Sequence, residues 1–149
     1  MAWAFSSVPP FKRNVVMPVA RKEWLQMLAG SPNPQPRALG YVGNSAGAYA
    51  VTCLALDLPE SCAVATIAGF GMPEALLETD RPMLGHLSFT SFVNGDDPAT
   101  EPAERFQAEL GARGGILPIQ AGAGGHAFED YVANGAVRKA FAWVLKRLP

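Results

Sequence analysis

The sequence predicts an α/β fold in which a parallel sheet of about five strands carries helices on both faces. From about residue 38 onward, short apolar runs alternate with amphipathic or alanine-rich stretches. Such alternation is typical of strands and helices that follow one another in a parallel sheet. The apolar runs are nearly continuous, as expected for strands buried on both sides. At 149 residues, the chain has the length of one ordinary domain.

Four strands are expected after residue 37, and each ends at a polar or glycine-rich turn. They cover Ala38–Val42, Ala63–Ala68, Leu87–Val93 and Ile116–Gln120. Helical spacing or composition predicts helices over Ala46–Leu58, Pro73–Thr79, Pro102–Ala112 and Val137–Leu148. The last helix is expected to bury one apolar face, made of Val137, Phe141, Val144, Leu145 and Leu148.

The first 37 residues are expected to form an atypical segment in front of a core at residues 38–149, within a single domain that spans residues 1–149. Asn14–Val19 is expected to form a fifth strand, and Arg21–Leu28 a helix. The three prolines between Ser31 and Arg37 exclude a regular helix there and predict a stiff, extended connector.

Composition argues against several classes of partner. The net charge is −1 and no stretch clusters Lys and Arg, which argues against nucleic acid or an anionic membrane surface as the main partner. No run approaches the ~18 apolar residues that a membrane-spanning helix needs, and the first residues lack the basic region of a signal peptide. A soluble, cytoplasmic protein is therefore expected. Cys53 and Cys62 lack metal-type spacing, and two buried free thiols are favoured over a disulfide.

A candidate nucleophile stands where an apolar strand meets an alanine-rich helix, in the sequence Gly-Asn-Ser-Ala-Gly. Such a tight turn lifts Ser45 above the sheet in a strained conformation, and Gly43 and Gly47 supply the absence of a Cβ that the turn requires. The Ala46 N–H, at the helix N-terminus, is expected to face a developing oxyanion. The competing interpretation is a glycine-rich turn with an N-capping serine.

A candidate acid and a candidate base lie at the ends of later strands. Asp97 follows the third strand in Asn-Gly-Asp-Asp-Pro, and His126 follows the fourth in Gly-Gly-His-Ala-Phe. The carboxyl ends of parallel strands meet at one edge of the sheet, so Ser45, Asp97 and His126 are predicted to form a nucleophile–acid–base triad. Asp96 is the alternative acid. The competing interpretations are a turn residue for Asp97 and a plain loop histidine for His126.

These three segments resemble the elbow, the acid turn and the histidine loop of the α/β-hydrolase superfamily, and the resemblance covers residues 38–148. The histidine loop resembles in particular the dienelactone-hydrolase and small carboxylesterase branch. Dienelactone hydrolases use a cysteine nucleophile, so Ser45 favours the esterase side. The resemblance implies a serine esterase that cleaves small carboxylic esters through an acyl-enzyme intermediate. No metal or organic cofactor is expected.

The chain departs from the family pattern before the elbow. The family has several strands and a second oxyanion donor there, whereas this sequence has only 37 residues and no His-Gly-Gly-Gly-type segment. Two alternatives therefore stay open: a catalytically inactive hydrolase-like module for binding or assembly, and an acyltransferase with the same triad. The chain is expected to be a truncated form, a piece of a larger enzyme, or a minimal version that dimerises.

Two further expectations concern the surroundings of the triad. A sheet that is short on its N-terminal side leaves an open edge, and open edges tend to pair, which predicts a homodimer or larger assembly. Phe70, Met72 and Phe128 adjoin strand ends or the histidine loop. They are expected either to line an apolar pocket for the substrate or to belong to the core.

Overall fold

The computed structural model describes residues 26, 30, 38–69 and 86–149. In chain order, the elements are β1 (Leu39–Asn44), α2 (Ala46–Asp57), β2 (Ser61–Ile67), β3 (Ser88–Asn94), α4 (Thr100–Ala112), β4 (Ile119–Gly122), α5 (Phe128–Ala133) and α6 (Ala136–Leu145). Three expected elements lie outside the described residues, apart from Gln26: the strand Asn14–Val19 and the helices Arg21–Leu28 and Pro73–Thr79.

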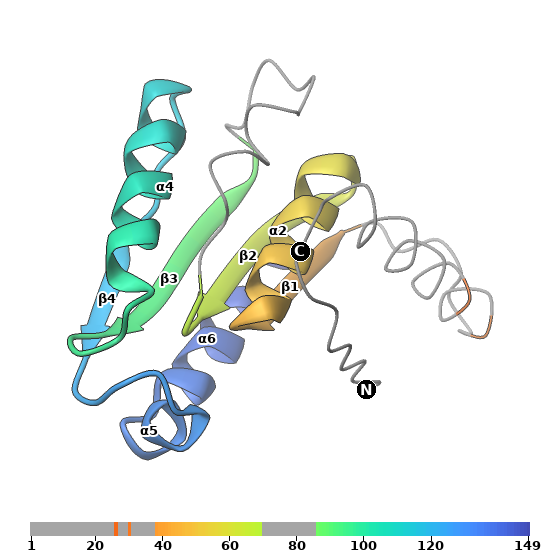
Figure 1. The fold of residues 1–149 in the computed structure, drawn as a ribbon. Coiled ribbons are helices and arrows are strands. Elements are labelled where there is room, and N and C mark those ends of the chain that lie inside the picture. Colours follow the sequence, from red (N-terminus) through yellow and green to blue (C-terminus); the bar gives the residue numbers. More distant parts are fainter. Residues whose placement is uncertain (1–25, 27–29, 31–37, 70–85) are drawn as a thin grey trace.

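The four described strands form one parallel sheet in the order β1-β2-β3-β4. Val42 stands beside Ala65, Thr66 beside Ser91, and the other strands follow in the same sense. Neighbours in sequence are thus neighbours in space. All four carboxyl ends therefore gather at one edge of the sheet, in the lower part of Figure 1 near α5.

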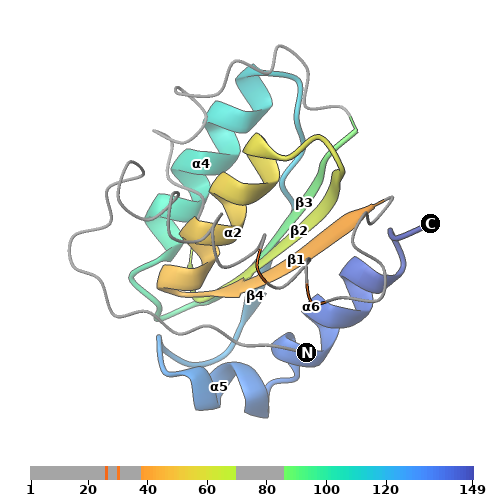
Figure 2. The same cartoon turned by 90° about the vertical axis from the view of Figure 1, so that its right-hand side faces the viewer.

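Helices cover both faces of this sheet, which confirms the predicted α/β class. Figure 2 shows α2 and α4 on one side of the strands and α5 and α6 on the other. Every residue of β2 and β3 except Cys62 and Ser88 is buried, because both strands lie between two helical layers.

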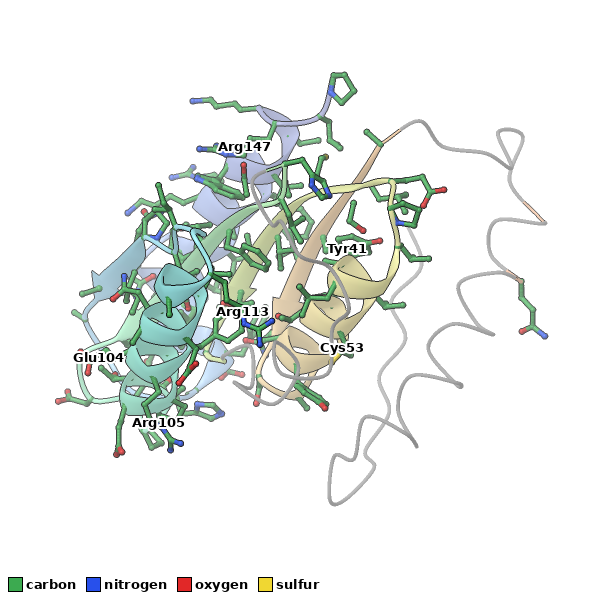
Figure 3. All side chains as sticks on the ribbon, turned by 90° about the horizontal axis from the view of Figure 1, so that it is seen from above. Tyr41, Cys53, Glu104, Arg105, Arg113 and Arg147 are labelled. Carbon is green, nitrogen blue, oxygen red and sulfur yellow. The ribbon has the colours of Figure 1, made fainter. Side chains whose placement is uncertain are left out.

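The α2 and α4 side is packed with large apolar side chains. Phe89 of β3 meets Phe106 of α4 edge to face, with ring centroids 6.0 Å apart. As the helical spacing predicted, α4 buries Ala103, Phe106 and Leu110. Figure 3 shows Glu104 and Arg105 on the outer side of α4. Tyr41 and Cys53 are buried where β1 and α2 pack together.

On the α6 side of the sheet, the buried face of the last helix differs from the predicted one. The buried residues of α6 are Ala136, Ala140 and Val144, whereas Leu145 is 66% exposed and Leu148 lies beyond the helix end. A Cβ at Gly40 of β1 would collide with the Val144 side chain. The helix therefore approaches the strand through a stripe that is mostly alanine, which leaves Leu145 on the outside.

Two other local predictions were inaccurate. The fourth strand begins at Ile119 instead of Ile116, and Ile116 is 78% exposed. Pro118 has no backbone N–H to donate to a neighbouring strand, so only its carbonyl takes part, as acceptor from the Ser91 N–H. The short helix α5 was not predicted at all.

The cysteines are free, as favoured over the disulfide, although only Cys53 is fully buried. The half-buried Cys62 thiol donates to the Leu39 carbonyl at 3.2 Å. Within the described part of the chain, no helix has the length and apolar character that a membrane crossing requires.

Candidate active site

Ser45 occupies the turn between β1 and α2 in a conformation that L-residues rarely adopt, with φ 50° and ψ −118°. Such a residue costs about 1–3 kcal/mol of strain and persists only where its surroundings hold it. Two backbone hydrogen bonds do so: the Ser45 N–H donates to Ile67 O at 2.8 Å, and the Ser45 carbonyl accepts from the Ala48 N–H at 2.9 Å. The end of β2 therefore clamps the turn.

The glycines around the turn differ in how much space they leave. A Cβ at Gly43 would lie 2.5 Å from the Gly47 carbonyl oxygen, so this position has no room for a side chain. At Gly47, in contrast, a Cβ would meet no heavy atom of the described residues within 4 Å, apart from the nearby backbone of its own helix. The second tight position is instead Gly69, where a Cβ would lie 2.7 Å from the Ser45 carbonyl oxygen.

The Ser45 side chain points to a histidine instead of capping its own helix. Its Oγ lies 3.2 Å from Nε2 of His126, and α2 has no side-chain capping hydrogen bond. Ser45 thus holds the N-cap position of α2, but its side chain does not cap the helix. Ala46 is the first residue of α2, so its N–H has no partner within the helix.

The other ring nitrogen of His126 faces Asp97. Nδ1 lies 2.9 Å from Asp97 Oδ1 and 3.0 Å from Oδ2. The His126 side chain is 48% exposed, while that of Asp97 is fully buried. Asp97 is also a turn residue, because its Oδ1 accepts from the Ala99 N–H at 2.7 Å. Asp96 is exposed, and its N–H donates to the Gly124 carbonyl.

Asp97 accepts a further hydrogen bond from a residue that sequence reasoning missed. The hydroxyl of Tyr131, on α5, donates to Asp97 Oδ2 at 2.5 Å. Burial raises the pKa of Asp97, but hydrogen bonds from Tyr131, the Ala99 N–H and His126 outweigh it and hold the pKa below its usual range. Burial and the bond to Asp97 raise the pKa of Tyr131. Tyr131 is therefore neutral and able to donate.

Three polar side chains hold the histidine loop, residues 123–127, against the end of β3. Asn94 donates to the Gly125 carbonyl at 3.0 Å, and Asp130 accepts from the Gly125 N–H at 2.9 Å. Asn134 donates to the Asn94 side chain at 2.7 Å and to the Ala123 carbonyl at 3.1 Å. These contacts fix the backbone just before His126.

The signal for this network in the sequence is weak. Asn134-Gly135 is a helix-ending pair, and it marks the end of α5. Together with the acidic residues at positions 129 and 130, it could have indicated the helix, and hence Tyr131 on its inner face. Nothing in the sequence indicates which atoms these side chains reach.

Of the three residues expected to line a pocket or belong to the core, the structure describes only Phe128. Phe70 and Met72 lie outside the described residues, and Phe128 is 44% exposed at the start of α5. Across the described ranges, no group of three or more His, Cys, Asp or Glu side chains is arranged to hold a metal ion.

Comparison with known proteins gives likeness of structure but not of sequence. The sequence matches no protein-family model and is significantly similar to no curated protein. Among solved structures, a ferulic acid esterase aligns with 97% of this chain and 64% of its own length, at TM-score 0.71 and 15% identity.

Two further solved structures are similar. The capsule O-acetyltransferase of Neisseria meningitidis serogroup A aligns with 87% of this chain and 64% of its own, at TM-score 0.58 and 12% identity. A YdeN-like hydrolase from Pectobacterium atrosepticum aligns with 91% and 70%, at TM-score 0.52 and 16% identity.

These likenesses define the class of fold. The chain has an α/β-hydrolase-like fold, and it spans a little under two thirds of the length of the first two structures. At 12–16% identity, they carry the fold alone, so the activity is argued below from the residues themselves.

Proposed function

We propose that this chain is a serine hydrolase that cleaves small carboxylic esters, with Ser45 as nucleophile, His126 as base and Asp97 as acid. The observation that carries the proposal is the unbroken series of contacts from Ser45 Oγ through both ring nitrogens of His126 to the Asp97 carboxylate. A nucleophile, a base and an orienting acid in hydrogen-bond reach of one another are the general arrangement for covalent catalysis.

The direction of proton transfer follows from the partner of each ring nitrogen of His126. The ionised Asp97 carboxylate can only accept, so Nδ1 carries the proton and donates to it. In neutral imidazole, Nε2 is then left with a lone pair that accepts the Ser45 hydroxyl proton. His126 would therefore remove this proton as Ser45 Oγ attacks the ester carbonyl carbon, and Asp97 would stabilise the imidazolium that forms.

The N-terminus of α2 is proposed to stabilise the negative charge that develops on the substrate carbonyl oxygen. The strained turn at Ser45 places the Ala46 N–H next to the nucleophile and at the positive end of a twelve-residue helix. When the tetrahedral intermediate collapses, the C–O bond to the alcohol breaks and His126 Nε2 returns the proton to the leaving oxygen. A water molecule then attacks the acyl-enzyme with the same base, which releases the acid and restores Ser45.

An acyltransferase is the second candidate, because the same triad can pass the acyl group to an acceptor other than water. The likeness to a protein named as a capsule O-acetyltransferase favours keeping this candidate. The two candidates share every step up to the acyl-enzyme. They differ in whether an added alcohol acceptor increases the rate at which the acyl-enzyme breaks down, and this can be measured by adding alcohols to the ester assay.

The direct test is hydrolysis of p-nitrophenyl butyrate by the wild-type chain and by Ser45→Ala. Removal of a triad nucleophile is expected to lower kcat by about 10⁶-fold. A matched control is Ser88→Ala, because Ser88 begins β3 at the opposite edge of the sheet. Residual activity of Ser45→Ala within tenfold of the wild type would refute the assignment, provided that circular dichroism shows both variants folded.

The proposal extends to the assembly of the chain. In the described part, β1 hydrogen-bonds to β2 on one side only, and open strand edges are seldom left bare. We therefore expect a homodimer or larger species, in which residues 1–149 fold as one domain. Light scattering at micromolar concentration measures this directly, and a folded species near 15.8 kDa would contradict it.

A further inference from the structure

We propose that Tyr131 is a positioning residue for the acid: its hydroxyl keeps Asp97 ionised and turned toward His126. The inference rests on the proposed function for its catalytic meaning, since it adds a fourth side chain to the series that starts at Ser45. Tyr131 is not itself open to a substrate, because its side chain is fully buried and packs among residues of the sheet and α6.

The Tyr131 hydroxyl is itself fixed in place. It accepts from the Asn94 backbone N–H at 2.9 Å, and Asn94 is the last residue of β3. The oxygen therefore has one hydrogen left to give, and it gives it to Asp97 Oδ2 at 2.5 Å. The donor is attached at one end to the sheet and at the other to a helix, so it cannot follow the carboxylate if the latter rotates.

Each oxygen of the Asp97 carboxylate accepts a hydrogen bond from a fixed donor. Oδ1 accepts from the Ala99 N–H, and Oδ2 accepts from Tyr131. His126 Nδ1 lies within 3.0 Å of both oxygens. Two fixed donors thus set the orientation of the carboxylate, and His126 Nδ1 lies at a similar distance from both of its oxygens.

The Tyr131 hydroxyl also helps to keep the buried Asp97 carboxylate ionised. Asp97 is 3% exposed, and a buried carboxylate without donors would favour its protonated form. A protonated acid could no longer accept fully from His126 Nδ1 or stabilise the imidazolium. The tyrosine supplies the shortest of the hydrogen bonds that Asp97 accepts, at 2.5 Å, and this bond lowers the pKa of Asp97. Without its hydroxyl, the carboxylate would be both freer to rotate and easier to protonate.

The test is Tyr131→Phe, which keeps the ring in the core and removes only the hydroxyl. We expect kcat for p-nitrophenyl butyrate to fall about tenfold or more with little change in KM, because a buried hydrogen bond to a charged group is lost. We also expect the acid limb of the pH profile of kcat to move to higher pH. The matched control is Tyr41→Phe, since Tyr41 is also a buried tyrosine whose hydroxyl contacts Ser61 at 3.1 Å on the far side of the sheet.

A second readout does not depend on activity. The Nδ1–H proton of His126, hydrogen-bonded to a carboxylate, gives a proton resonance at low field in nuclear magnetic resonance spectra. Only one other histidine, His86, is present to be distinguished from it. In Tyr131→Phe this resonance should shift or broaden, whereas in Tyr41→Phe and in Ser45→Ala it should persist.

The outcomes separate this inference from the proposed function. Activity that survives in Ser45→Ala would refute the function and leave the resonance test of Tyr131 intact. A wild-type pH profile and an unchanged resonance in folded Tyr131→Phe would overturn the positioning role alone. If Tyr131→Phe does not fold, 3-fluorotyrosine at position 131 keeps the hydroxyl and makes it a stronger donor. The resonance must then move, and its failure to move would overturn the proposal.

Discussion

The nucleophile turn and the histidine loop lie at the same edge of the sheet, yet different forces hold them. The turn is held by backbone atoms. Two main-chain hydrogen bonds fix Ser45, and the lack of a Cβ at Gly43 and Gly69 lets the backbone pack closely around it. The histidine loop is instead held by the side chains of Asn94 at the end of β3, Asp130 in α5 and Asn134 just after α5. The turn therefore depends on glycines that leave room for the backbone, whereas the histidine loop depends on hydrogen bonds from polar side chains.

The same difference explains what the sequence could predict. A turn that needs glycine leaves a local signature, because only glycine fits, and Gly43-Asn44-Ser45 could be recognised without any structure. Asp97 and His126 were found because parallel strands bring their carboxyl ends to one edge. The class of fold followed from the same alternation of apolar runs and helices.

Contacts between side chains far apart in the chain left no such signature. Tyr131 reaches Asp97 across 34 positions, and Asn134 reaches Asn94 across 40. Gly47 matches the pattern of the turn, but among the described residues no atom outside its own helix would crowd a Cβ at this position. Gly69 was visible only as the end of an apolar run, and its contact with the Ser45 carbonyl needed the geometry of two adjacent strands.

Among the changes that compare the two halves of the site, the largest effect is expected in the side-chain half. Asp97→Asn should lower kcat by about 10⁴-fold, because an amide can donate to His126 Nδ1 and so favour the wrong tautomer. Asp96→Asn is the matched control and should change kcat by less than about threefold, since Asp96 is exposed. Steady-state kinetics on p-nitrophenyl butyrate measures both. The reverse ranking would transfer the role of acid to Asp96.

The nucleophile turn is tested by comparing two variants, each of which adds one methyl group at a glycine. Gly43→Ala should destabilise the protein by about 1–3 kcal/mol, because the new Cβ would overlap the Gly47 carbonyl oxygen and the Val51 side chain. Gly47→Ala should be neutral or stabilise by up to about 1 kcal/mol, because alanine is the better helix former. Urea unfolding compares the two variants. Equal losses of unfolding free energy would show that the turn is not crowded as described.

The smallest expected effect is the pH dependence of stability. The folded-state pKa of Asp97 is lowered, so its contribution is fully present above the unfolded pKa of about 3.9 and is lost as pH falls through the folded value. Between about pH 5 and pH 3, the unfolding free energy of the wild type should therefore fall more steeply than that of Asp97→Asn, which has no carboxylate to protonate at this position. Parallel curves over this range would mean that the hydrogen bonds to Asp97 add no stability.

The central claim is that Ser45 is an activated nucleophile, and covalent labelling with a fluorophosphonate probe measures this without knowledge of the natural substrate. Intact-mass spectrometry should show one adduct per chain, located on Ser45 by peptide mapping. The adduct should be absent in Ser45→Ala and form far more slowly in His126→Ala, while His86→Gln should label at the wild-type rate. A folded wild-type chain that takes up no label, or that labels equally in Ser45→Ala, would contradict the account and favour an inactive hydrolase-like module.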